Sequence, residues 1–176
     1  FEVLSMKPGD KLVSMLPMAH MYGMAFEFLY EFSAGCHIYF LTRMPSPKII
    51  FQAFAEIKPN LIISVPLIIE KIIKKNVLPK LETPAMKLLL KVPIVNDKIK
   101  STIREQIINS FGGNFEVIIV GGAAFNHDVE TFLKMIDFPY TVGYGMTECG
   151  PILAYEDWKR FKPYSCGKAA PRMEVK

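Results

Sequence analysis

The sequence lacks any hydrophobic run long enough to cross a membrane. Such a helix needs about 18 consecutive apolar residues, and the nearest candidate, LIISVPLII at 61–69, is short and broken by Pro66. A buried strand that leads into a helix explains this segment better. Apolar residues make up 51% of the chain and charged residues 22%, which is the balance of a globular protein and argues against a disordered one.

Cysteine is scarce as well. The three cysteines, Cys36, Cys149 and Cys166, lie far apart, are odd in number and show no metal-binding spacing such as CxxC. We therefore expect reduced thiols in an intracellular protein, with a cytoplasmic location.

Acidic residues are almost missing between Lys71 and Arg104. This stretch has nine basic residues against Glu82 and Asp97, a local excess of +7 in a chain whose net charge is +4. Two interpretations stay open. The lysines form solvated helix faces, or they form a surface for anionic partners such as phosphates or anionic lipid, with peripheral membrane contact. Few aromatic residues alternate with the lysines, so we expect no binding of nucleic acid.

Short apolar runs alternate with segments of helical periodicity. The pattern predicts strands at 11–17, 37–41, 60–65, 115–120 and 140–145. It predicts helices at 20–34, 46–58, 69–77, 99–107 and 129–136, the last with Asn126 as its N-cap. Pro79, Pro84 and Pro93 mark a looser helical region. This order predicts an α/β fold with a largely parallel β-sheet and helices on both faces.

The segments that follow the predicted strands carry many small and polar residues. They include PMAHMYG at 17–23, GGAAF at 121–125 and GYGMTE at 143–148. In parallel α/β sheets, ligands bind beyond the carboxyl ends of the strands. We therefore expect these segments to meet at one binding site.

The segment VGGAAF at 120–125 presents almost no side chain. Gly121, Gly122 and Ala123 let the backbone approach a flat ligand closely. The alternative is a plain tight turn between a strand and a helix. The segment does not match the GxGxxG pattern, so a dinucleotide site is poorly supported.

The segment GYGMTE offers three groups suited to a nucleotide. The ring of Tyr144 can stack, the hydroxyl of Thr147 can donate to a phosphate oxygen, and the carboxylate of Glu148 suits Mg²⁺. The alternative is a helix N-terminus that Thr147 caps, with Glu148 facing the helix dipole. His20, which also follows a strand, is either a structural residue or part of the same site.

Taken together, these residues resemble the adenylate-forming superfamily of acyl-CoA synthetases, luciferases and adenylation domains. The motif YGMTE at 144–148 is similar to one of its most specific signatures. Others follow in the family's order: LPMAHMYG at 16–23, VPLIIEKI at 65–72, VGGAAF at 120–125 and SCGKAAPRMEVK at 165–176. The resemblance covers nearly the whole chain, and VPLIIEKI is most like the long-chain fatty acyl-CoA synthetase branch.

The resemblance implies a two-step reaction. A carboxylate attacks the α-phosphate of ATP in the presence of Mg²⁺ and gives an acyl-adenylate and pyrophosphate, and CoA then displaces AMP to form a thioester. The implied substrates are a fatty acid, ATP and CoA. Such chemistry depends on positioning and a metal ion more than on a strong base, so no protein nucleophile is needed.

The resemblance also implies roles for individual residues. Around the nucleotide, Tyr144 would pack on adenine, Thr147 would contact the α-phosphate and Glu148 would hold Mg²⁺. Gly121, Gly122 and Ala123 would lie along the adenine and the acyl group at the nucleotide site. The acyl pocket would be lined by His20, Tyr22, Gly143 and Gly145, and Gly145 would also belong to the nucleotide site.

The same resemblance predicts that residues 1–176 are a single α/β fragment of the large AMP-binding N-terminal domain. A Ser/Thr/Gly-rich phosphate loop would precede residue 1, and a ribose-binding aspartate, a hinge and a C-terminal domain with a catalytic lysine would follow residue 176. We expect the chain alone to be inactive. Two alternatives remain: another adenylating ligase, acting on an aryl or short-chain acid or loading a carrier protein, and a non-catalytic nucleotide-binding module.

Overall fold

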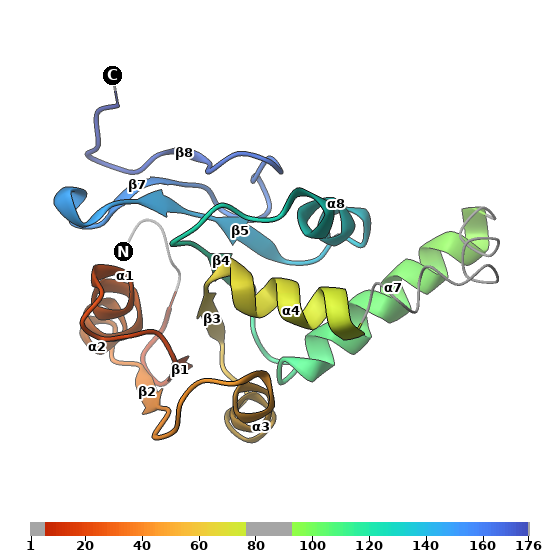
Figure 1. The fold of residues 1–176 in the computed structure, drawn as a ribbon, viewed down its shortest axis with the longest axis horizontal. Helices are drawn as coiled ribbons and strands as arrows, with labels where there is room; N and C mark the ends of the chain where they lie inside the picture. The colour runs from red at the N-terminus through yellow and green to blue at the C-terminus, as the bar shows by residue number, and fades with distance from the viewer. Residues whose placement is uncertain (1–5, 77–92, 176) are drawn as a thin grey trace.

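The computed structural model describes residues 6–76 and 93–175. Its centre is a five-stranded sheet with the order β2-β1-β3-β4-β5, in which every strand pair is parallel (Figure 1). The strands are β1 (Lys11–Ser14), β2 (His37–Phe40), β3 (Leu61–Ser64), β4 (Val117–Val120) and β5 (Tyr140–Val142). All four residues of β3 and of β4 are buried, as expected for strands covered on both faces. The predicted parallel α/β fold is confirmed.

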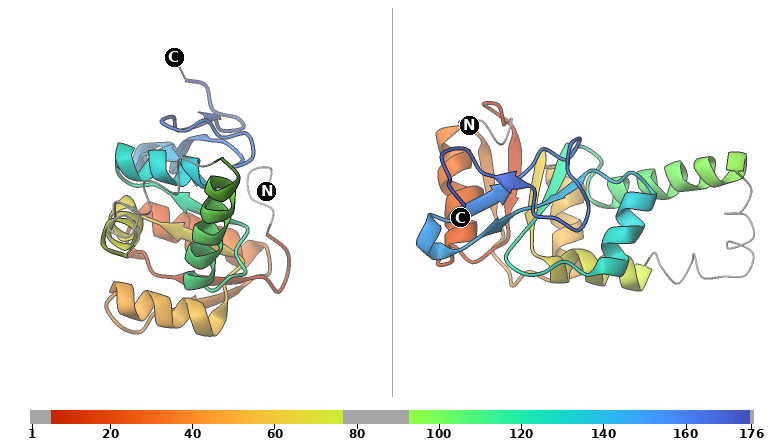
Figure 2. Two further views of the ribbon diagram at one scale, coloured as in Figure 1. Left: turned by 90° about the vertical axis from the view of Figure 1, so that its right-hand side faces the viewer. Right: turned by 90° about the horizontal axis from the view of Figure 1, so that it is seen from above.

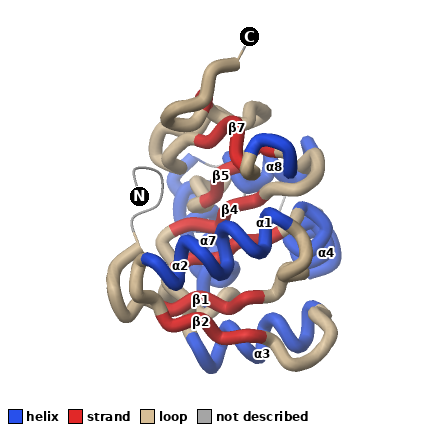
Figure 3. The backbone as a smooth tube through the Cα atoms, turned by 90° about the vertical axis from the view of Figure 1, so that its left-hand side faces the viewer, coloured by secondary structure: helices blue, strands red, loops and turns tan. Residues whose placement is uncertain are grey.

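Helices cover both faces of this sheet. One face carries α3 (Pro47–Ile57), α4 (Pro66–Asn76), α7 (Pro93–Ser110) and α8 (His127–Met135). The other carries a continuous helical segment formed by α1 (Met21–Gly23), the π-helix η1 (Met24–Leu29) and α2 (Tyr30–Ser33), toward which Figure 3 looks. The helix predicted at 20–34 is therefore confirmed. Figure 2 shows α7, in green, extending outward beyond the sheet.

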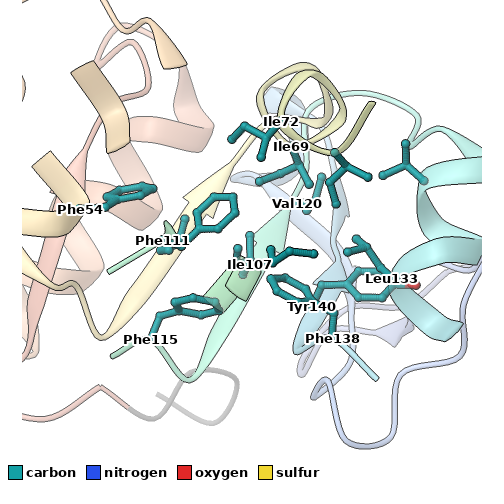
Figure 4. Packing of buried hydrophobic residues seen from close by; sticks show 14 of the residues in the cluster. Phe54, Ile69, Ile72, Ile107, Phe111, Phe115, Val120, Leu133, Phe138 and Tyr140 are labelled. Atoms are coloured by element: carbon teal, nitrogen blue, oxygen red, sulfur yellow. The ribbon is translucent and has the colours of Figure 1, made fainter. Parts of the chain in front are cut away.

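Alternate residues of β1, β3 and β4 supply two separate cores. Ile62 and Ile118 point into the larger core, under α3, α4, α7 and α8, while Ile63 and Ile119 point toward the helix of residues 21–33. Aromatic rings dominate the larger core near α3 and α7, where the rings of Phe54 and Phe111 have centroids 5.9 Å apart (Figure 4). This period-two alternation is what a sheet with two covered faces requires.

Helix ends follow the expected side-chain chemistry. The side-chain oxygen of Asn126 accepts a hydrogen bond from the backbone N–H of Val129 at 3.2 Å, so the predicted N-cap of α8 is confirmed. At α3, Ser46 accepts from the N–H of Ile49 and Pro47 occupies the first helical turn. Pro79 and Pro84 lie outside the described residues, as does the part of the basic stretch at 77–92.

The predicted strand at 140–145 is wrong in its second half. β5 ends at Val142, and Tyr144–Gly145 forms β6, which belongs to a second, antiparallel sheet with β7 (Ile152–Tyr155) and β8 (Lys168–Ala169). Gly143 still donates its N–H to the carbonyl of Val120 at 2.9 Å, and the chain then leaves the parallel sheet. This departure places the residues after Val142 over the carboxyl edge of the parallel strands.

The cysteines and the lengths of the helices were also predicted from the sequence. Cys36, Cys149 and Cys166 are all free thiols, as expected. Within residues 6–76 and 93–175, no helix combines the length and the apolar character needed to cross a membrane.

Candidate functional site

Two adjoining cavities lie at the carboxyl ends of the parallel strands. The smaller has a volume of about 70 Å³ and is walled mainly by apolar side chains, including Phe26, Ile63, Ile119 and Tyr155. The larger has a volume of about 740 Å³, and polar residues make up more of its wall. The two share His20, Gly122 and the segment 143–147, so one wall faces both cavities.

Every residue predicted for the site lines at least one cavity. Tyr22 and Gly121 line the smaller one only, and Ala123 and Glu148 line the larger one only. The other six line both: His20, Gly122, Gly143, Tyr144, Gly145 and Thr147. The prediction that these segments meet at one edge of the sheet is therefore confirmed, while the individual roles stay predictions.

Tyr22 is wedged between the sheet and the small cavity. Its hydroxyl donates to the carbonyl of Ser64 at 3.3 Å and lies 3.4 Å from that of Ile119. A Cβ added to Gly121 would stand 3.1 Å from the Tyr22 hydroxyl oxygen, so the absence of a side chain at Gly121 leaves room for the Tyr22 ring. Burial, helped by the nearby Glu27 and Tyr155, raises the pKa of Tyr22 well above its ordinary value. Tyr22 is therefore a neutral hydrogen-bond donor at any physiological pH.

Two glycines of the wall are required by the backbone. Gly122 has φ +84°, a left-handed conformation that side chains other than glycine rarely adopt. Gly145 is required for a different reason, because a Cβ there would collide with the carbonyl of Pro151. The segment at 121–125 is thus a tight turn between a strand and a helix, which was the alternative considered for it. It also lines both cavities.

His20 has the structural role considered for it, and it also lies in the walls of both cavities. Its Nδ1 accepts a hydrogen bond from the N–H of Tyr22 at 3.1 Å and so caps α1. Because Nδ1 is the acceptor, the neutral ring carries its proton on Nε2, which is the atom left to donate to a ligand. His20 is exposed and lines both cavities.

Thr147 does not have the capping role considered above, whereas Glu148 does lie in the first turn of a short helix. The short 3₁₀ helix η2 (Thr147–Cys149) has Met146 at its N-cap, and no side chain caps it. The Thr147 hydroxyl and the Glu148 carboxylate are exposed on the cavity wall, and within the described part of the chain no ion pair involves Glu148. Both groups are free to meet a ligand.

Several residues of the site escaped sequence reasoning. Ile152 and Tyr155 reach the small cavity from β7, whose apolar run ILAY was the available signal. His127, Glu130 and Tyr164 also line the larger cavity. They come from α8 and from a loop about 30 residues later, and no local pattern connects them.

An apolar cavity and a more polar one that share a glycine-rich wall at the carboxyl edge of a parallel sheet define an α/β ligand-binding domain. The chain belongs to the AMP-binding enzyme family, whose model matches residues 1–176. The resemblance stated from the motifs is therefore confirmed.

Relatives among characterised proteins are long-chain-fatty-acid–CoA ligases. Ligase 4 of Saccharomyces cerevisiae is 27% identical over 154 residues, which cover 80% of this chain and 22% of the relative. The ligase ACSBG2 of Rattus norvegicus is 24% identical over 180 residues, or 90% of this chain and 27% of the relative. The chain thus spans about a quarter of the length of these relatives.

Solved structures of similar fold include two proteins of low sequence identity to this chain. MatB from Rhodopseudomonas palustris, in its apo form, has a TM-score of 0.67 at 17% identity, covering 97% of this chain and 28% of MatB. O-succinylbenzoate CoA synthetase (MenE) from Bacillus subtilis, in complex with ATP and magnesium ion, has a TM-score of 0.65 at 15% identity, covering 94% of this chain and 28% of MenE. At these identities the likeness shows the fold.

Proposed function

We propose that this chain forms part of the active site of an ATP-dependent fatty acid–CoA ligase. The enzyme would activate a carboxylate as an acyl-adenylate with release of pyrophosphate, and then form the CoA thioester with release of AMP. The observation that carries the proposal is the wall shared by an apolar and a more polar cavity, made of His20, Gly122 and segment 143–147. A carboxylate that ends an apolar chain would meet a nucleotide phosphate at such a wall.

The residues of the wall suit these two ligands. The apolar lining around Phe26, Ile119 and Tyr155 favours an alkyl chain, and the larger cavity has room for a nucleotide. Tyr144, whose side chain is 49% exposed, offers a ring to the adenine. Holding both ligands at one wall brings the carboxylate and the α-phosphate together, which is the main catalytic requirement of this chemistry.

Glu148 suits a magnesium ion. Its exposed carboxylate lies on the wall of the larger cavity, and among the described residues no group of three or more His, Cys, Asp or Glu side chains could hold a metal. Mg²⁺ is usually held by one or two carboxylates, with substrate phosphates and water completing its shell, so a lone carboxylate fits. When bound, the ion would neutralise charge on the phosphates. Thr147 would donate its hydroxyl to an α-phosphate oxygen.

Pyrophosphate release tests this proposal. The longer protein that contains this chain is expected to release pyrophosphate from ATP and Mg²⁺ only when a fatty acid is present. Release with an aryl or short-chain acid alone would point to another adenylating ligase. Binding of ATP or AMP without acid-dependent release would identify a nucleotide-binding module and contradict catalysis.

The substitution Glu148→Gln tests the metal role. Because an amide binds Mg²⁺ poorly, the rate of pyrophosphate release should fall by about 100-fold or more, with unchanged circular dichroism. Asp128→Asn is the matched control, since Asp128 is an exposed carboxylate on α8 that lines neither cavity. Equal rates in the wild type and in Glu148→Gln would refute the role.

We also propose that the protein is cytoplasmic and contacts anionic membranes through its basic stretch. The support is the charge excess of +7 between Lys71 and Arg104. Sedimentation with vesicles should then increase with the fraction of anionic lipid and decrease with salt, because exposed charges are screened over about 10 Å at 0.1 M salt. Binding independent of both would contradict the proposal.

A further inference from the structure

Tyr164 has an unusual backbone conformation at the wall of the larger cavity. Its φ is +66°, in the left-handed region that a bulky side chain rarely adopts. The described residues include three other non-glycine positions with positive φ, Lys58, Asp137 and Arg172, and none of these lines either cavity. Strained residues of this kind persist where surrounding contacts hold them, and they cluster at functional sites.

Three contacts hold Tyr164 in place. Its backbone N–H donates to Oε1 of Glu130 at 2.9 Å, and its hydroxyl forms a hydrogen bond with Oγ1 of Thr131 at 2.8 Å. Its ring stacks on that of His127, with centroids 4.2 Å apart and an angle of 11° between the planes. All three partners belong to α8, so one rigid helix fixes both the backbone and the ring.

Glu130 is the anchor of this arrangement. Its side chain is 4% exposed, and the same Oε1 also accepts a hydrogen bond from the hydroxyl of Tyr140 on β5 at 3.3 Å. A carboxylate this buried is retained only when hydrogen bonds compensate its lost hydration. Here those bonds connect the Tyr164 loop to both α8 and the central sheet.

The ring of Tyr164 does not pack in the hydrophobic core. Tyr164 remains 48% exposed, and it lines the larger cavity together with His127, Glu130 and Tyr144. A parallel aromatic pair with an open face, in a cavity that has a second tyrosine in its wall, is suited to a flat aromatic ligand.

We propose that Tyr164, anchored by Glu130 and stacked on His127, is a specificity-determining contact for the base of the nucleotide. The inference rests on the proposed function, because it assumes that the larger cavity takes ATP. It adds a base contact supplied by α8 and the loop at 164–166, separate from the wall of residues 143–147.

Replacing Tyr164 by glycine tests the role of the ring without changing the backbone conformation. Glycine adopts positive φ without strain, so Tyr164→Gly removes the aromatic surface and leaves the loop its conformation. Asp137→Gly is the matched control, since Asp137 has φ +51° and lies outside both cavities. Affinities of the longer protein for ATP and for inorganic tripolyphosphate would be measured by calorimetry. Circular dichroism would verify that each variant is folded.

The expected result is selective for the base. Tyr164→Gly should raise the Kd for ATP about tenfold, the size expected for one lost stacking contact, and leave that for tripolyphosphate unchanged. Asp137→Gly should change neither value. Tyr164→Phe, which keeps the ring and loses the bond to Thr131, should lose less ATP affinity than Tyr164→Gly.

Two results would overturn the inference and distinguish it from the proposed function. If the wild type binds ATP and Tyr164→Gly binds it equally well, or loses ATP and tripolyphosphate affinity to the same extent, the base contact is wrong and the proposed function stands. If the wild type binds no ATP, the proposed function and this inference both fail.

Discussion

At the scale of single residues, the two glycines that flank Tyr144 have different tolerances. A Cβ on Gly145 would collide with the carbonyl of Pro151, whereas a Cβ on Gly143 would stand 3.7 Å from the carbonyl oxygen of Ala154, an ordinary contact. Both glycines line both cavities. The fold therefore requires glycine at 145. At 143 the fold would accept a larger residue, so a requirement for glycine there would come from ligand binding.

This difference predicts opposite behaviour for two alanine variants. Gly145→Ala should destabilise the protein by about 1–3 kcal/mol, because the β6–β7 turn must shift to relieve the overlap. Gly143→Ala should fold as stably as the wild type and weaken ligand binding, since its methyl group adds bulk beside the shared wall. Thermal unfolding and ATP titration separate the two effects. Equal stability of both variants would contradict the packing at Pro151.

The predictable part of the site consists of residues that follow strands. Gly121, Gly122 and Glu148 could be found because parallel strands bring their carboxyl ends to one edge, and small or acidic residues stand out there. Tyr164 could not be found in this way. Its place depends on a buried bond to Glu130, 34 residues earlier, and such long-range pairing leaves no local pattern.

At the scale of elements, Glu27 connects the helix at 21–33 to the end of β1. Its side chain is fully buried, and Oε2 accepts hydrogen bonds from the hydroxyl of Ser14 and from the N–H groups of Met15 and Leu16 at 2.9–3.0 Å. These bonds fix the start of the loop that leads to His20. Burial raises the pKa of Glu27 to about 7, and the backbone hydrogen bonds offset only part of that effect.

This pKa predicts how stability changes with pH. Between the ordinary pKa of 4.5 and about 7, the folded protein keeps a proton on Glu27 that the unfolded chain loses. The free energy of unfolding should therefore fall as pH rises through this window, by about 3 kcal/mol from this group. Glu31, buried on the same helix with a pKa raised to about 7, acts in the same direction.

Urea denaturation from pH 5 to pH 8 measures this dependence. Glu27→Gln has no titrating group at this position and keeps a carbonyl acceptor, so its stability should change less with pH than that of the wild type. Glu56→Gln is the control, because Glu56 is an exposed carboxylate on α3. An unchanged pH dependence in Glu27→Gln would show that Glu27 is already ionised at pH 5.

The helices and the parallel strands were predictable from their periodicity, and the second sheet was not. The continuous apolar runs at 61–63 and 117–120 identify buried strands, whereas β6 and β8 have only two residues each. Strands this short leave no period to detect. Their position depends on pairing with β7, which is a long-range contact.

At the scale of the whole molecule, we propose that the site is one part of a larger active site. The chain spans 22% of the yeast ligase 4 it resembles. Among the residues that the structure describes, the cavity walls contain one acidic group suited to Mg²⁺, Glu148, and no lysine. The described residues of these walls therefore offer little positive charge to a triphosphate. We propose that the phosphate loop and the lysine-bearing domain lie in the rest of the protein.

This proposal predicts that residues 1–176 alone do not turn over. With ATP, Mg²⁺ and a fatty acid, pyrophosphate release should stay at the background rate, while the longer protein releases it in proportion to enzyme. Turnover by the 176-residue chain at a rate comparable to that of the longer protein would show that the site is complete without further segments.

The most direct test of the ligase proposal is the identity of the products. The longer protein would be incubated with ATP, Mg²⁺ and a long-chain fatty acid, and the products analysed by mass spectrometry with and without CoA. Without CoA the proposal predicts an acyl-adenylate and pyrophosphate, and with CoA it predicts an acyl-CoA thioester and AMP. Formation of ADP and an acyl phosphate, or ATP hydrolysis that is independent of the acid, would contradict it.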